Sequence, residues 1–131
     1  MINYNGFILA DEIGGPCAKQ TGLFSPYHEK HYLTLTVTSP AGVKSTYKTT
    51  FQFNPASGRF KDNDGLYCII QDAFCFYSAS DLTDFSNEYD YKSAAAARNA
   101  FNGCRRAYKF LTAAGLTPDD LQNITDIMEG F

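Results

Sequence analysis

Apolar and polar residues alternate with a period of two in residues 31–38, HYLTLTVT, and again in residues 46–53, TYKTTFQF. This period, together with the many β-branched and aromatic residues, is typical of half-buried strands. The segment between them begins with residues 39–42, SPAG, in which proline suits a turn corner and glycine can adopt a positive φ. The pattern predicts an antiparallel hairpin whose two apolar faces lie on one side of the sheet.

Residues 1–27 have a weaker periodicity. The apolar residues among the first nine positions predict an N-terminal strand. The glycines and prolines that follow predict a loop, and these are Gly14, Gly15, Pro16, Gly22 and Pro26.

The period becomes helical after residue 64. Apolar residues recur there at helical spacing, namely Leu66, Ile69, Ile70, Ala73, Phe74 and Tyr77. A short helix is expected after Asp81 and should include Phe85 and Tyr89, and a long helix is expected from about Ser93 to a C′ glycine at Gly115. Residues 117–120, TPDD, combine a cap, a proline at the first helical position and two acids, and they predict the start of a last helix.

These signals predict a single α+β domain over residues 1–131. An antiparallel β-hairpin or small sheet at about residues 31–53, with an added N-terminal strand, should be packed by three to four amphipathic helices at about residues 64–129. The 131 residues are 44% hydrophobic and 19% charged, which suits one hydrophobic core and argues against disorder. The chain has neither an apolar run of bilayer length nor a signal-peptide pattern at its start, so a cytoplasmic location is expected.

Enzyme motifs are absent from the sequence. It contains no G-x-S-x-G, phosphate-binding loop or G-x-G-x-x-G pattern, although catalysis by scattered residues stays open. His28 and His31 flank Glu29 without a third metal ligand at suitable spacing, so surface or strand-edge histidines are favoured over a metal site. No C-x-x-C pair occurs, and reduced, buried thiols are expected at Cys17, Cys68, Cys75 and Cys104. The prediction is a non-enzymatic protein with no catalytic residue, metal or cofactor.

Two charged surfaces remain as candidate binding sites. The first interleaves acids with aromatic residues, and we call it the acidic-aromatic step: Asp81, Asp84, Phe85, Glu88, Tyr89, Asp90 and Tyr91. Helix capping explains Asp81 and Asp84, but the added aromatic residues favour a protein partner. The net charge of −3, with most acids in the C-terminal half, suits a basic partner better than nonspecific binding to duplex nucleic acid.

The second surface lies along the predicted long helix. Cations recur there opposite its apolar stripe, and we call this set the basic face: Arg98, Arg105, Arg106 and Lys109. It could contact phosphates or an acidic protein surface. The alternative is a solvated helix face with basic residues near the helix C-terminus, which the helix dipole favours.

Residues 64–111 contain the stretches GLYCIIQDA, DLTDFSNEYDY and SAAAARNAFNGCRRAYKFL. This order resembles a recurrent group of small phage and mobile-element proteins, in which a strand pair precedes a helix, a D-F-x-x-E-[FY]-x-Y step, and a helix of alanine, arginine and aromatic residues. Here the step is carried by Asp84, Phe85, Glu88, Tyr89 and Tyr91. The alanine-rich run departs from the more charged helix of that group, and the N-terminal third has no counterpart in it.

The resemblance implies a phage or mobile-element accessory protein acting in the bacterial cytoplasm, a setting rich in inhibitors of host defence such as anti-CRISPR proteins. On that basis we expect a non-enzymatic inhibitor that binds a host nuclease or effector complex, a protein or ribonucleoprotein, through the acidic-aromatic step. The alternative is a nucleic-acid-binding accessory protein that uses the basic face. Neither reading includes a membrane partner, and neither predicts an oligomeric state.

Overall fold

The computed structural model describes residues 1–17, 29–53, 61–89 and 91–130. It confirms the α+β class, and within these ranges the chain forms four strands followed by four helices. The chain forms two compact units, Met1–Cys68 and Ile69–Phe131.

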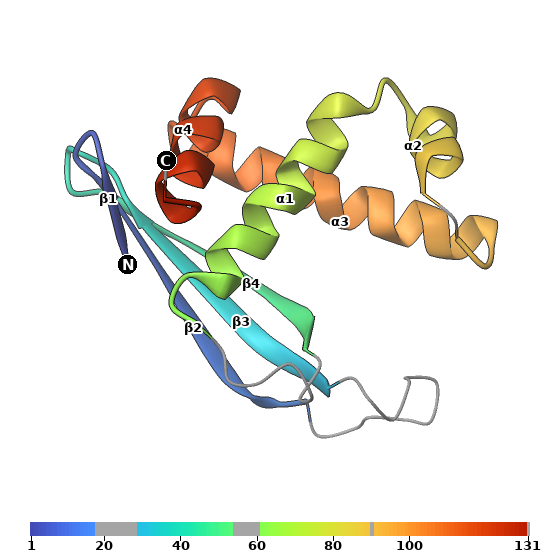
Figure 1. Cartoon of the computed structure of the whole chain (residues 1–131), viewed down its shortest axis with the longest axis horizontal. Helices are drawn as coiled ribbons and strands as arrows, with labels where there is room; N and C mark the ends of the chain where they lie inside the picture. The colour runs from blue at the N-terminus through green and yellow to red at the C-terminus, as the bar shows by residue number, and fades with distance from the viewer. Residues whose placement is uncertain (18–28, 54–60, 90, 131) are drawn as a thin grey trace. The chain divides into compact units, whose positions relative to one another are not determined.

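The strands of the first unit form one antiparallel sheet in which each strand pairs with the next along the chain (Figure 1). They are β1 (Ile2–Tyr4), β2 (Phe7–Pro16), β3 (Glu29–Thr38) and β4 (Lys44–Phe53). The β3–β4 hairpin confirms the pair expected from the alternating pattern. The N-terminal region supplies two strands where the sequence predicts one.

The predicted loop at Gly14 is wrong, because residues 14–16 belong to β2. The pairing of β2 with β3 shifts register between Ile13 and Pro16. Such an irregularity leaves a strand position that needs no backbone donor, which is where proline is tolerated in a sheet. The other glycine and proline of that predicted loop, Gly22 and Pro26, lie outside the described residues.

The register places the apolar positions of neighbouring strands on one face, with Leu9 opposite Val37 and Ile13 opposite Leu33. Leu9, Leu33 and Val37 are fully buried. On the opposite face Tyr32 keeps 55% of its surface exposed. The first unit therefore has one apolar face and one open, polar face, as period-two patterning requires.

His31 lies on the buried face of the sheet, and only 7% of its surface is exposed. The expectation of a surface or strand-edge histidine is wrong for this residue, because His31 continues the alternation of Leu33 and Leu35. Its Nδ1 donates a hydrogen bond to the carbonyl oxygen of Gly14 at 3.0 Å, which satisfies this buried nitrogen.

Helix α1 (Asp64–Ser78) begins in the first unit, against this sheet. A carboxylate oxygen of Asp11 accepts a hydrogen bond from the backbone N–H of Leu66 at 3.0 Å. An anion at this place satisfies an unpaired helix donor and interacts favourably with the helix dipole. Gly65 allows the start of α1 to lie this close to Asp11 and Leu33, because a Cβ at residue 65 would overlap Leu33 Cδ1 and lie 2.9 Å from Asp11 Oδ2.

Gly65→Ala should therefore lower the free energy of unfolding by about 1–3 kcal/mol, since a methyl group would have to displace Leu33 or break the Asp11 contact. Gly103→Ala is the matched control, because its Cβ would meet only Arg106 Nη2 at 3.7 Å. The control should raise stability by about 0.5–1 kcal/mol through helix propensity. Urea unfolding of both variants, followed by circular dichroism, measures the two effects, and equal stabilisation by both would contradict the packing described at Gly65.

The helices of the second unit begin and end close to the predicted signals. After the last part of α1 come α2 (Leu82–Glu88), α3 (Ala94–Ala113) and α4 (Pro118–Met128). Side chains cap their first turns, at Asp81 for α2, as predicted, and at Ser93 for α3, where the sequence predicts only the approximate start of the helix. Tyr89 departs from the prediction, because it is the C-cap of α2 with extended backbone angles and does not continue the helix.

Helix α4 opens with a complete capping box. Thr117 Oγ1 accepts from the N–H of Asp120 at 3.2 Å, and Asp120 Oδ2 accepts from the N–H of Thr117 at 2.8 Å. Gly115 precedes it with a φ of 102°, as expected of a residue just past the end of α3. The boundary predicted from residues 117–120 is confirmed.

Thr117→Ala should lower the free energy of unfolding by about 1 kcal/mol, because the N–H of Asp120 loses its acceptor. Thr117→Ser keeps the hydroxyl and should retain most of the stability. Thermal or urea unfolding of the pair measures this difference, and an alanine variant as stable as the serine variant would show that the box contributes little.

Candidate functional site

The acids of the acidic-aromatic step hold the first turn of α2. Asp81 Oδ1 accepts from the N–H of Asp84 at 2.8 Å, and Asp84 Oδ2 accepts from the N–H of Ser80 at 2.9 Å. Both carboxylates remain exposed, as does Glu88. Capping thus explains two of the acids and leaves Glu88 as an exposed acid at the end of the helix. Asp90 lies outside the described residues.

The aromatic residues of this step pack against one another, with Phe85 buried and Tyr89 and Tyr91 half-buried. Only 1% of the surface of Phe85 is exposed. Its ring centroid lies 4.9 Å from that of Tyr89, 5.7 Å from that of Tyr91 and 5.3 Å from that of Phe101. These distances are those of favourable aromatic pairs. The structure therefore brings Phe85, Tyr89 and Tyr91 together as packing residues of the second unit.

The ring contacts continue from Phe101 towards the surface. Phe76 packs against Phe101 at 5.4 Å and against Tyr108 at 5.3 Å, and Tyr108 stacks on Tyr77 at 5.8 Å with 21° between the ring planes. Tyr77 is 56% exposed, so the chain of rings begins at a buried phenylalanine and ends at an exposed tyrosine. The sequence places Tyr77 on the apolar stripe of α1, and the structure shows that this last member of the stripe is exposed.

Two thiols and a tyrosine form a further cluster inside the second unit. The hydroxyl of Tyr89 donates to Cys75 Sγ at 3.1 Å, and Cys104 neighbours Cys75. That hydrogen bond, with burial, raises the pKa of Tyr89 to about 12, and burial raises the pKa of the Cys104 thiol to about 12. Both groups therefore keep their protons at neutral pH, and Cys104 is a poor nucleophile there.

Among the residues that the structure describes, the other titratable groups do not form a metal site. Burial raises the pKa of Asp72 to about 6, although part of this side chain is exposed to solvent. Over residues 1–17, 29–53, 61–89 and 91–130, no three His, Cys, Asp or Glu side chains gather to hold a metal ion. His28 lies outside these ranges. None of the four cysteines, all of which lie in the described ranges, forms a disulfide. The expected burial is confirmed for Cys104 and is wrong for Cys17, Cys68 and Cys75, which are half-buried.

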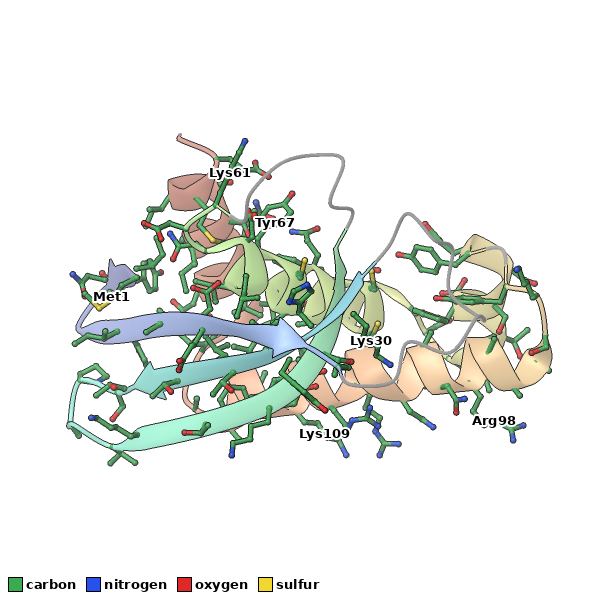
Figure 2. The ribbon with its side chains drawn as sticks, turned by 90° about the horizontal axis from the view of Figure 1, so that it is seen from below. Met1, Lys30, Lys61, Tyr67, Arg98 and Lys109 are labelled. Carbon is green, nitrogen blue, oxygen red and sulfur yellow. The ribbon has the colours of Figure 1, made fainter. Side chains whose placement is uncertain are left out.

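The basic face of α3 is exposed along its whole length. Arg98, Arg105, Arg106 and Lys109 are all exposed, and α3 contains no acidic residue. Figure 2 shows the side chains of Arg98 and Lys109 projecting from the same side of the helix. Lys109 lies eleven positions after Arg98, which corresponds to about 16 Å along the helix axis. The cations predicted from the sequence to share a helix face therefore form one extended positive surface.

The buried positions of α3 explain why this face points outward. Ala97, Cys104, Ala107 and Leu111 are the buried residues of the helix, and they lie opposite the cations. Small residues at three of the four positions suit close packing, while the long basic side chains require solvent or a partner. The amphipathic pattern of α3 thus explains which of its sides is buried and which is exposed.

No protein-family model matches the chain, and no curated protein or solved structure matches it either. In the part of the chain that the structure describes, no helix has the length and apolar character needed to cross a membrane.

Proposed function

We propose that this protein is a non-enzymatic nucleic-acid-binding accessory protein that binds through the basic face of α3. The observation that supports this most strongly is the exposure of four cations on one helix that has no acid. A nucleic-acid backbone is the polyanion that such a face fits best, because its phosphates repeat along a line.

Three of the four cations are arginines, which favours phosphate as the ligand. A guanidinium group can donate two parallel hydrogen bonds to phosphate oxygens and stays charged at every physiological pH. The rest of the chain carries a net negative charge, since the whole chain is at −3 and α3 alone contributes four positive charges. Repulsion at the other surfaces would orient a nucleic acid towards α3.

A second candidate follows from the exposed carboxylates of α2. We infer that they could instead bind the basic nucleic-acid channel of a host nuclease or effector complex, and the protein would then be an inhibitor of host defence of the anti-CRISPR kind. The supporting observation is the exposure of Asp81, Asp84 and Glu88 at one short helix. Glu88→Lys tests this candidate without removing a helix cap, whereas substitution of Asp81 or Asp84 would also remove a hydrogen bond at the start of α2.

Fluorescence anisotropy distinguishes the two candidates. The full chain is titrated into labelled oligonucleotides at low salt, with polyglutamate as a competitor that has charge but no phosphates. The first candidate predicts saturable binding that polyglutamate displaces poorly. Efficient displacement by polyglutamate would indicate an acidic protein as the ligand, and a complete lack of binding would reject nucleic acid and leave the inhibitor.

A further inference from the structure

The exposed end of the aromatic chain lies beside the basic face. Tyr77 keeps 56% of its surface exposed, and it is stacked on Tyr108, which belongs to α3. Tyr108 directly precedes Lys109 and lies three residues after Arg105. Residues three apart on a helix are surface neighbours, so the stacked pair borders the cations of this turn.

The ring of Tyr77 is supported by the aromatic rings of two other residues. Tyr108 packs against it with nearly parallel planes, and Phe76 packs against Tyr108 at 5.3 Å. This support limits the side-chain entropy that Tyr77 would lose on binding a flat ligand. An exposed, supported ring beside phosphate-binding cations is the combination that single-strand binders use, because unpaired bases can stack on the ring while the backbone follows the positive surface.

We propose that the ligand of α3 is a single-stranded nucleic acid, one base of which stacks on Tyr77 while its neighbouring phosphates contact Arg105 and Lys109. This inference rests on the proposed nucleic-acid-binding function and names the form of nucleic acid bound. A duplex holds its bases in its own stack and cannot offer one to Tyr77 without unstacking it.

Tyr77→Ala should weaken binding of a single strand by about 5- to 150-fold, the range found when one stacking aromatic residue is removed. Tyr77→Phe is the matched control, because it keeps the ring and should retain the affinity. The same variants should bind a duplex of the same sequence as the unmodified protein does. Because Tyr77 is mostly exposed, circular dichroism should show unchanged helix content in both variants.

The test is an anisotropy titration of the full chain and the two Tyr77 variants with a labelled strand of about 15 nucleotides, and with its duplex. Weaker single-strand binding by the alanine variant alone supports the inference. Equal affinity of the alanine and unmodified proteins for the single strand overturns it, while the function proposed for α3 survives if binding still depends on Arg105. Failure of the unmodified protein to bind either oligonucleotide overturns both.

Discussion

The double variant Arg105→Glu/Lys109→Glu should bind a single-stranded oligonucleotide about two orders of magnitude more weakly than the unmodified protein. A hydrogen bond to a charged group contributes about 1.5–3 kcal/mol, and each 1.4 kcal/mol corresponds to a tenfold change in affinity. Removing two such contacts therefore suffices for the expected loss, and the two new carboxylates add repulsion. Both residues are exposed, so the variant should fold normally.

Lys44→Glu/Lys48→Glu is the matched control for this charge reversal. Both lysines are exposed residues of β4, and the substitution changes the net charge by the same amount. Anisotropy titrations at one salt concentration should show a much smaller loss for the control. Equal losses in the two double variants would mean that binding responds to net charge alone, and an unaffected α3 variant would remove α3 from the interface.

The second large effect concerns stability. Phe85→Ala should lower the free energy of unfolding by about 3–5 kcal/mol, because it leaves a cavity where three other rings meet. Phe85 is 1% exposed and contacts the rings of Tyr89, Tyr91 and Phe101. Urea unfolding followed by the helical circular dichroism signal measures this loss.

Two control variants show whether the loss of stability comes from the cavity at Phe85. Phe85→Leu fills part of the cavity and should lose less, and Ile127→Ala removes a side chain that is 45% exposed and should have a small effect. A Phe85→Ala variant as stable as the Ile127→Ala variant would contradict the packing role of the acidic-aromatic step. It would also restore the interpretation of Phe85 as a residue kept for a partner.

Local signals of the sequence predicted most of the secondary structure. Period-two alternation gave the β3–β4 hairpin, and the residues at 117–120 gave the start of α4, because both depend on neighbours in the chain. The start of β3 and the end of β2 could not be predicted as well from local signals. Proline and glycine at residues 14–16 are typical of a loop, and only the pairing with β3 reveals that a register shift accommodates them.

The candidate sites were harder to predict, because they depend on contacts between residues that are far apart in the sequence. Phe85 and Phe101 belong to different helices, so no spacing rule shows that their rings pack together. Tyr77 was missed as a surface residue because a helical stripe gives the direction of a side chain and does not say how far the covering residues extend. The basic face was predictable, since residues four and seven apart on one helix share a side whatever its surroundings are.

The dependence of affinity on salt tests the central claim most directly. The logarithm of the association constant for a single strand should fall linearly with the logarithm of salt concentration, with a slope of about −2 to −3 if the four cations of the basic face contact phosphates. The Arg105→Glu/Lys109→Glu variant should show a slope about half as steep, since two phosphate contacts are gone. No binding at low salt, or a slope unchanged by this variant, would contradict a phosphate-binding role for α3.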